Sequence, residues 1–320
     1  MPDFPLWPQC NLGCVFCSNP VDGYRRTSDH YSFDAIRRKI EDYKRGERTF
    51  LKFDDVSDYF NLTGGEPTLH PQFARILALL RVEFPETLIR LLTNGRTLSD
   101  SGFARRICGI GGPNFEIAVP IFGGDARSHE ATSRTPGSFE QTVQGLRNVR
   151  EFRRAGQALE IRVIMTRIQV KFLSGLLDFL LKEFSWIDRI VFLYEELEGF
   201  AELYSDRLKI SQSECARALD SMHDKLAGFK DARLYHFSLC TVPTRLWPRV
   251  WNTLAPFKVT WKEECRLQCA HRRDCLGIHR SYLKHSEASD IAPIRSPRAA
   301  IRSGNRYHPF LSEPAHEPLA

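Results

Sequence analysis

The sequence is 320 residues long, 42% hydrophobic and 26% charged, with a formal net charge of +6. This composition is ordinary for a folded globular protein and argues against a disordered chain. The mild positive charge is spread along the chain instead of forming basic runs, which argues against nucleic acid as a partner. No apolar run is long enough to span a membrane, and the first residues do not form a signal peptide, so we expect a cytoplasmic protein.

Short apolar segments alternate with longer segments of helical periodicity over about the first 200 residues. The strand candidates, in chain order, are residues 4–7, 59–63, 88–93, 115–120, 159–165 and 189–194. Helical patterns between them begin at Ser32, Pro71, Ser138 and Phe172. This alternation predicts an α/β fold of parallel strands with crossover helices. Six such units fit a partial (β/α)6 TIM-type barrel, because a full eight-unit barrel needs about 250 residues.

The pattern changes after residue 194. An acidic turn at 195–198 is followed by a capping box that predicts a helix over 211–226, and by a weakly alternating strand at 232–239. From about residue 285 the chain is poor in apolar residues and carries five prolines, so we expect a mobile tail. The expected domains are residues 1–200 (barrel), 201–284 (a small cysteine-rich domain) and 285–320 (tail).

The nine cysteines are unevenly distributed. An odd number without a signal peptide indicates a reducing compartment, where clustered cysteines bind metals more often than they form disulfides. One group lies near the start of the chain and another near its end. Cys108 and Cys215 stand alone in helical patterns, and we expect both to be buried as small hydrophobic residues.

Cys10, Cys14 and Cys17 form the pattern C-x3-C-x2-C near the N-terminus. A four-iron cluster normally takes one thiolate per iron, so three cysteines on a short loop can hold three irons and leave the fourth open. The alternative is a structural zinc site, which needs a fourth ligand close by. The nearest candidates, Asp29 and His30, lie outside the usual spacing, so the pattern favours an iron–sulfur cluster.

The segment Gly64-Gly65-Glu66-Pro67 directly follows the strand at 59–63. Glycines at a strand end let the backbone approach a ligand closely, and a carboxylate there can accept a hydrogen bond from an ammonium group. Read alone, the segment is an ordinary turn. Together with C-x3-C-x2-C, in this order and at about this distance, it resembles the radical S-adenosylmethionine (SAM) superfamily.

The resemblance implies that Cys10, Cys14 and Cys17 hold a [4Fe-4S] cluster whose open iron is chelated by the amine and carboxylate of SAM. It further implies a set of SAM-binding residues: Gly64, Gly65 and Glu66 for the amine, Phe16 for the adenine, Asn94 for the ribose and Arg162 for the carboxylate. For two of these an alternative stays open. Asn94 could belong to a plain turn, and Arg162 could face outward from its strand.

In such enzymes an external electron reduces the cluster, SAM is cleaved, and a 5'-deoxyadenosyl radical abstracts hydrogen from the substrate. The resemblance therefore implies a donor such as flavodoxin or ferredoxin as a partner. Four residues near predicted strand ends are candidates for substrate-facing acid–base chemistry, although each could be an ordinary loop residue. They are Asp125, His129, Tyr194 and Glu195.

The second group of cysteines comprises Cys240, Cys265, Cys269 and Cys275. Four thiolates can saturate a second [4Fe-4S] cluster, or they can form a structural zinc site. The group resembles the twitch extension of radical SAM enzymes, which is the short form of the SPASM domain and binds one auxiliary cluster. With Cys240 as a ligand that cluster is closed; without it one iron is open.

Residues 117–139 and 239–294 resemble radical SAM maturases of His-Xaa-Ser peptide systems, with two departures. Ser133 stands where many relatives have an arginine, and the first cluster ligand is already Cys10, so recruitment of a peptide would need a leader-peptide-binding partner or another surface. The first hypothesis is thus modification of a residue in a ribosomally made peptide. The second is a small metabolite such as an amino acid, sugar or nucleoside. The third, an iron–sulfur electron carrier, leaves the Gly-Gly-Glu-Pro turn unexplained.

Overall fold

The computed structural model describes residues 2–19, 28–47, 51–52, 59–305 and 307–312. Its main sheet has the strand order β2-β1-β3-β4-β5-β6-β7-β8-β9, and only β2 runs antiparallel to its neighbour. The parallel strands are β1 (Pro2–Trp7), β3 (Tyr59–Gly64), β4 (Leu88–Leu92), β5 (Phe115–Pro120), β6 (Ala158–Met165), β7 (Arg189–Tyr194), β8 (Ala232–Tyr235) and β9 (Val250–Trp251). The edge strand β2 is Leu51–Lys52.

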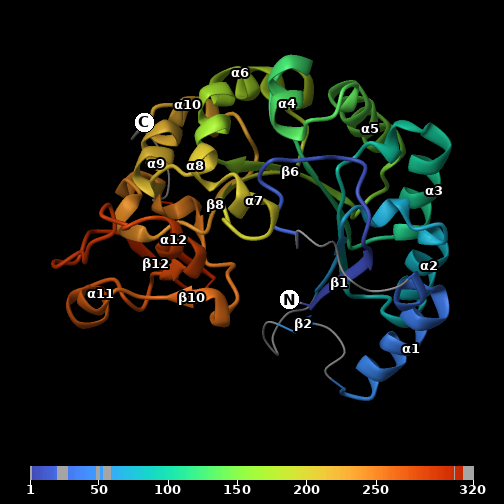
Figure 1. Ribbon diagram of the computed structural model, residues 1–320, viewed down its shortest axis with the longest axis horizontal. Helices are drawn as coiled ribbons and strands as arrows, with labels where there is room; N and C mark the ends of the chain where they lie inside the picture. Colours follow the sequence, from blue (N-terminus) through green and yellow to red (C-terminus); the bar gives the residue numbers. More distant parts are fainter. Residues whose placement is uncertain (1, 20–27, 48–50, 53–58, 306, 313–320) are drawn as a thin grey trace, which may run out of the picture.

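Helices lie along the outer side of the curved sheet, as Figure 1 shows. They are α1 (Phe33–Lys44), α2 (Phe73–Glu83), α3 (Ser101–Gly111), α4 (Ala126–Ser133), α5 (Ser138–Phe152), α6 (Arg167–Phe184), α9 (Gln212–Asp220) and α10 (His223–Ala227). The short helices α7 (Phe200–Leu203) and α8 (Ser205–Leu208) follow β7. The two edge strands of the sheet, β2 and β9, are not paired with each other. The predicted partial α/β barrel is therefore confirmed.

The helices form where capping and apolar spacing agree. The Ser32 side chain accepts a hydrogen bond from the backbone N–H of Ala35 at 3.2 Å, and α1 then buries Ile36 and Ile40 on one face. In α6 the buried positions recur at helical spacing against the sheet, namely Leu173, Leu176, Leu177 and Leu180. These contacts place the apolar core between the helices and the strands.

Charged side chains from four neighbouring strands form a buried network. Arg90 Nε lies 2.7 Å from Glu116 Oε1, and Arg189 Nη1 lies 3.0 Å from Glu160 Oε2. Burial raises the pKa of Glu160, but the guanidinium groups of Arg162, Arg90 and Arg189 outweigh it and lower that pKa to about 2. Buried charges persist only when they are paired in this way.

The chain after β7 departs from the predictions in three places. Strands β8 and β9 extend the barrel sheet beyond the six predicted units, and the cysteine-rich domain expected over 201–284 stays a prediction. The helix expected over 211–226 is divided into α9 and α10, although its capping box between Ser211 and Glu214 forms as predicted. The strand expected over 232–239 ends at Tyr235, because His236 adopts a left-handed backbone conformation with φ of 70°.

The segment from residue 285, predicted to be a mobile tail, contains a packed hairpin. Strands β12 (Ile301–Asn305) and β13 (His308–Leu311) form a hairpin. Phe310 is fully buried with its ring centroid 4.8 Å from that of Trp247, and the His308 ring stacks on Trp251 at 4.3 Å. The segment is polar on average, so the anchoring roles of Phe310 and His308 were not predicted. Residues 313–320 lie outside the described part of the chain.

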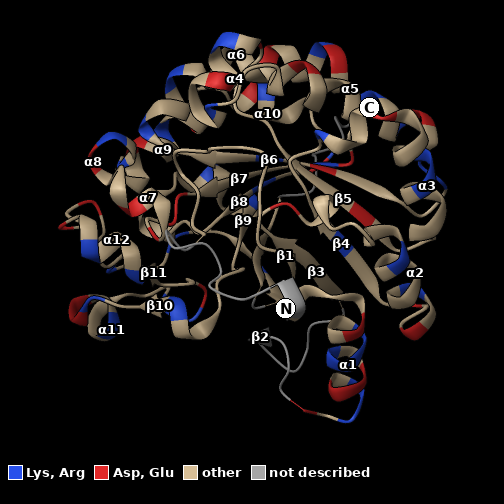
Figure 2. Ribbon diagram, turned by 45° about the vertical axis from the view of Figure 1, so that its right-hand side comes forward, with Lys and Arg blue, Asp and Glu red and all other residues tan. Residues whose placement is uncertain are grey.

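Basic and acidic residues are interspersed over the outer helices in Figure 2, in keeping with a solvated outer surface. Within the described ranges, no helix combines the length and apolar character needed to cross a membrane.

Candidate functional site

The cysteine loop (residues 10–17) follows β1 at the carboxyl end of the barrel strands, where barrel active sites form. Its backbone is fastened to two helices. Gly13 N and Val15 N donate to the carbonyls of Ser133 and Thr132 at the end of α4, at 3.0 and 3.1 Å. Ala201 N in α7 donates to the Cys17 carbonyl at 2.9 Å. The fold therefore fixes the loop from two sides.

The three thiols lie close enough to act on one another electrostatically. Cys10 is exposed, and Cys14 and Cys17 are half-buried. Burial raises the pKa of all three thiols, and the neighbouring sulfurs of Cys17 and Cys10 raise that of Cys14 further. Leu12 N donates to Cys10 Sγ at 3.4 Å. Thiolates gathered here need a positive group to stabilise them, as an iron–sulfur cluster does.

The spacing of the sulfurs argues against a single zinc ion. Tetrahedral zinc at about 2.3 Å from each sulfur places neighbouring sulfurs about 3.8 Å apart. Among the described residues, one set of three His, Cys, Asp or Glu ligand atoms lies mutually within 4.8 Å, and it contains no cysteine. A four-iron cluster binds its thiolates on separate irons and so accommodates wider spacing. The donor set therefore fits a cluster better than zinc.

The turn at the end of β3 packs against the backbone just before the first cysteine. Gly64 has φ of 131°, and a Cβ on it would lie 2.3 Å from the Trp7 carbonyl oxygen. A Cβ on Gly65 would lie 2.3 Å from the Gln9 carbonyl oxygen. The N–H groups of Gly65 and Glu66 donate to those two carbonyls, each at 2.7 Å. Both glycines are thus required by the close approach of two chain segments.

We expect Gly65→Ala to displace the chain entering the cysteine loop, because the clashing atoms belong to the backbone and cannot rotate away. Loss of iron after reconstitution and a lower melting temperature are the expected results. Gly175→Ala is the matched control, since a Cβ there meets nothing within 4 Å in the middle of α6. Gly175→Ala should raise the free energy of unfolding by about 0.5–1 kcal/mol. Normal iron loading in Gly65→Ala would contradict the expectation.

The Glu66 carboxylate joins the ends of two neighbouring strands. It is 1% exposed and receives four hydrogen bonds. Its Oε1 accepts from Thr68 N at 3.1 Å, Thr68 Oγ1 at 2.5 Å and Thr93 Oγ1 at 2.7 Å, and its Oε2 accepts from Asn94 N at 2.7 Å. The sequence suggested that this carboxylate accepts from a ligand's ammonium group. In the structure all four of these donors belong to its own chain, and its predicted contact with the SAM amine stays a prediction.

Phe16 belongs to the cysteine loop, and Asn94 lies against it. The Asn94 amide donates to Asn11 Oδ1 at 2.6 Å and lies 3.8 Å from Cys10 Sγ. The Phe16 ring makes an edge-to-face contact with Phe122 at 4.9 Å between centroids. Asn94 therefore supports the loop directly, while its predicted contact with a ribose stays a prediction.

Arg162 lies on β6 within the charged network of the barrel. Its Nε donates to Glu160 Oε1 at 2.7 Å, and its charge also acts on Asp3 of β1 and Tyr59 of β3. Those strands lie three and four places away in the sheet order, so the side chain points into the barrel. Of the two alternatives for Arg162, the structure selects the inward one.

The four residues considered for acid–base chemistry are engaged or enclosed. Asp125 caps α4, and His129 is buried between two phenylalanine rings, where burial lowers its pKa to about 4. The Tyr194 hydroxyl donates to a backbone carbonyl at 2.6 Å. Glu195 is buried with neither carboxyl oxygen hydrogen-bonded, and burial raises its pKa well above the ordinary range. Asp125 is exposed, whereas His129, Tyr194 and Glu195 are buried, and a role of any of the four in acid–base chemistry stays a prediction.

The structure brings the four C-terminal cysteines together around one small pocket, here called the C-terminal cysteine pocket. Cys240 lies on a short 3-10 helix (Leu239–Thr241), Cys265 on α11 (Glu263–Gln268), and Cys269 and Cys275 in the loop that follows. Burial raises the pKa of Cys240 to about 12 and that of Cys275 to about 11, and the neighbouring thiols add to both shifts. Gly277 N donates to Cys275 Sγ at 3.4 Å.

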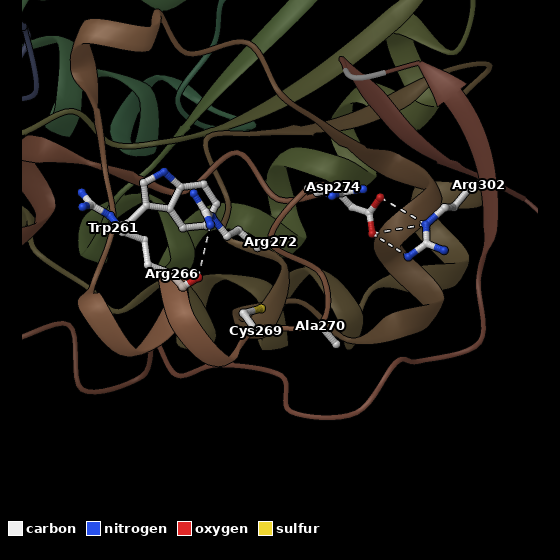
Figure 3. Close-up of a pocket in the computed structure, with 8 residues that line it drawn as sticks. Trp261, Arg266, Cys269, Ala270, Arg272, Asp274 and Arg302 are labelled. Carbon is white, nitrogen blue, oxygen red and sulfur yellow. Dashed lines mark hydrogen bonds and ion pairs between the residues drawn. The ribbon is translucent and has the colours of Figure 1, made fainter.

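A basic cavity of about 1050 Å³ adjoins this pocket (Figure 3). Trp261 and Cys269 line both spaces. The basic side chains around the cavity are Arg266, Arg272, Arg273 and Arg302, of which Arg302 pairs with Asp274 at 3.0 Å. The surplus of positive charge suits an anionic ligand or partner.

The structure also assembles a group that the sequence did not connect, here called the Glu–His–Lys cluster. Glu196 and Glu198 from the acidic turn after β7 lie against Lys258, His236 and His279. The two carboxylates were visible as an acidic turn. No spacing rule joins them to three residues from separate later segments, so only the fold reveals the cluster.

Comparison with known proteins finds a family model that matches part of this chain. Residues 4–156 match the model of the Radical SAM superfamily. No curated protein matches the sequence. Among solved structures, anSMEcpe with bound AdoMet and Kp18Cys peptide aligns with a TM-score of 0.53 at 14% identity, over 72% of this chain and 62% of that chain.

Two further structures are similar. HydG, a maturase of the [FeFe]-hydrogenase, has a TM-score of 0.50 at 9% identity, over 73% of this chain and 51% of that chain. SuiB of Streptococcus suis has a TM-score of 0.49 at 15% identity, over 72% of this chain and 48% of that chain. The chain thus spans between 48% and 62% of the length of these three proteins. At these identities the structural likeness shows the fold alone. The family match, and not this likeness, relates residues 4–156 to the Radical SAM superfamily, whose members are enzymes.

Proposed function

We propose that this protein cleaves SAM reductively and abstracts a hydrogen atom from a substrate. The observation that carries the proposal is the cysteine loop itself. Its three thiols share one environment at the carboxyl end of β1, and it lies beside a glycine turn that is hydrogen-bonded to the chain entering it. An electron carrier would need the cysteines but not this turn.

When bound, the cluster and SAM supply the electron transfer and the 5'-deoxyadenosyl radical. The residues of this chain would hold and orient them. Cys10, Cys14 and Cys17 would ligate the cluster, and the backbone of the Gly64–Gly65 turn would receive the SAM amine. Arg162, which points into the barrel, would balance the SAM carboxylate. The buried network beneath it keeps this guanidinium in place.

For the substrate we propose a residue of a ribosomally made peptide. The resemblance of residues 117–139 and 239–294 to peptide maturases supports this assignment. So does the fold shared with anSMEcpe, which has been solved with a bound peptide, although this second support is an analogy between folds. A small electron carrier such as flavodoxin or ferredoxin would supply the electron, and a leader-binding partner would deliver the peptide.

We further propose that the C-terminal cysteine pocket holds an auxiliary [4Fe-4S] cluster of the twitch type. Four thiols line it, and backbone N–H groups point at the sulfurs of Cys240 and Cys275. Such hydrogen bonds tune iron–sulfur clusters. With all four cysteines as ligands the cluster is closed, so it would transfer electrons or brace the domain and would not bind substrate.

Anaerobic reconstitution with iron and sulfide tests both assignments. We expect about eight irons per chain, and 5'-deoxyadenosine release from SAM under dithionite. A cleavage rate that increases with a candidate peptide, but not with amino acids, sugars or nucleosides, would support the peptide substrate, and the reverse would favour a small metabolite. A chain that binds neither iron nor SAM would contradict the proposed function.

Cys240→Ala is expected to remove the auxiliary cluster while SAM cleavage continues. Three thiolates leave one iron open and the cluster labile, so iron should fall from about eight toward about four per chain. Cys215→Ala is the matched control, because Cys215 is buried outside both cysteine groups and should keep the full iron content. Iron content and electron paramagnetic resonance (EPR) of the reduced protein measure the effect. Unchanged spectra would show that Cys240 is not a ligand.

A further inference from the structure

The basic cavity beside the C-terminal cysteine pocket is formed by one short part of the chain. Its lining residues come from Trp261, from α11, from the loop 269–275 and from β12. Residues 261–302 contain all of these segments, and they hold nine Lys and Arg against five Asp and Glu. This excess of four is large beside the formal net charge of +6 of all 320 residues. A considerable positive charge is therefore gathered around one cavity.

Three of the four arginines of the cavity carry a charge that no nearby carboxylate neutralises. Arg302 is paired with Asp274, with 3.0 Å between Nη2 and Oδ2. Arg266, Arg272 and Arg273 are exposed and form no ion pair with any residue of the described ranges. The Arg272 side chain is held in place by a hydrogen bond from its Nη1 to the Arg266 carbonyl at 3.3 Å. Guanidinium groups displayed in this way attract the carboxylates of another molecule.

The backbone beneath these arginines is fastened to the C-terminal segment. His271 is 1% exposed, its Nδ1 lies 3.1 Å from Asp274 Oδ2, and Arg298 N donates to its Nε2 at 2.9 Å. Ala270 N donates to the Ile294 carbonyl at 2.8 Å. The loop that carries the arginines is thus ordered before any partner binds, which lowers the entropic cost of binding.

The cavity shares a wall with the C-terminal cysteine pocket. Cys269 and Trp261 line both spaces. In the view of Figure 3, Cys269 lies between Arg266 on one side and the Asp274–Arg302 pair on the other. Figures 1 and 2 both place α11 at the outer edge of the molecule. A partner in the cavity can therefore approach from solvent and comes within one side chain of a proposed cluster ligand.

We propose that the basic cavity is the docking surface for a small electron-carrier protein whose surface is acidic around its redox centre. The inference rests on the proposed function, because it takes the C-terminal cysteine pocket to hold a cluster, to which the reduced carrier supplies one electron without any bond forming or breaking. Unneutralised guanidinium groups are complementary to the carboxylates of such a carrier.

The size and position of the cavity favour this partner over a nucleic acid. Electron-transfer complexes are weak, bury less than about 1,200 Å² and depend on charge steering, so one charged cavity is enough for them. A nucleic acid is bound along a longer track of basic residues. The wall shared with the cysteine pocket also gives an electron a short path, which a nucleic acid does not need.

Calorimetric titration with oxidised flavodoxin and with oxidised ferredoxin tests the docking without any turnover. The reconstituted protein should bind one of them one to one, at least about tenfold more weakly at about 0.5 M than at about 0.05 M ionic strength. The double variant Arg272→Glu/Arg273→Glu should weaken binding at least about tenfold at the lower ionic strength. In that variant the second-order rate of reduction by the reduced carrier should fall at least about tenfold, while reduction by dithionite stays unchanged.

The matched control is the double variant Arg106→Glu/Lys171→Glu, which makes the same change in net charge at exposed positions of α3 and α6. It should bind and accept electrons like the unaltered protein. Equal loss of binding in both double variants, binding of neither carrier, or tighter binding of a uridine oligonucleotide than of either carrier would overturn the docking proposal.

Iron content and EPR of the dithionite-reduced protein report separately on the proposed function. A protein that lacks the auxiliary cluster, yet binds a carrier through Arg272 and Arg273, would contradict the cluster assignment and support the docking surface. A protein with both clusters that binds neither carrier would keep the proposed function and overturn the docking surface.

Discussion

Replacing Cys10, Cys14 and Cys17 together by alanine is expected to lower the iron content from about eight to about four per chain and to abolish 5'-deoxyadenosine formation. The cysteine loop is fastened by its backbone to α4 and α7, so removal of the thiols should leave its path intact. The C-terminal cysteine pocket is built by later segments and shares no thiol with the loop. Iron analysis and chromatography of the SAM products measure both effects.

The control for this variant is Cys108→Ala, a buried cysteine of α3 outside both groups. It should retain the full iron content and SAM cleavage. Retention of about eight irons by the triple variant would show that the loop does not bind a cluster. Loss of all iron with native circular dichroism would show that the second site does not load by itself, and would contradict the assignment of two independent clusters.

Glu66→Gln is expected to lower the free energy of unfolding by about 2–4 kcal/mol. A carboxylate can accept all four hydrogen bonds that Glu66 receives, whereas an amide replaces one acceptor oxygen by a donor. If the amide oxygen keeps the donors from Thr68 and Thr93, the NH2 group meets the backbone N–H of Asn94. Two buried donors then face each other. Anaerobic denaturant titration measures the change.

Because Glu66 joins the end of β3 to the residue that contacts the cysteine loop, this variant should also bind SAM more weakly. Glu151→Gln provides the comparison, since Glu151 is exposed at the end of α5 and should change stability little. A loss below about 1 kcal/mol for Glu66→Gln would mean that the carboxylate is not required to join the strands.

Much of the fold could be predicted from the sequence because its signals are local. The strands at 115–120 and 189–194 have the predicted bounds, and the Ser32 cap and the Ser211 capping box form as expected. Cys108 and Cys215 are buried, as predicted. The cysteine loop and the Gly64–Gly65 turn could likewise be found, because each places its chemistry within a few consecutive residues.

Predictions that used average composition or a single residue type missed contacts with distant parts of the chain. The segment from residue 285 was predicted to be mobile because its composition is polar, yet Phe310 and His308 anchor a hairpin against Trp247 and Trp251. Glu66 was predicted to accept from an amine, which stays a prediction, but its hydrogen bonds from Thr93 and Asn94 at the end of the next strand were not foreseen. The sequence around Phe310 does not show that it contacts Trp247, and the sequence around Glu66 does not show that Thr93 and Asn94 donate to it.

The sequence by itself therefore determined the alternation of strands and helices, the thiol triad and the glycine turn, since these depend on spacing along the chain. Only the tertiary structure decided that Arg162 points into the barrel, that four distant cysteines line one pocket, and that Glu196 meets Lys258 and His279. The physical reason is that such contacts arise when crossover connections bring separate strand ends to one face, and no local pattern records which ends will meet.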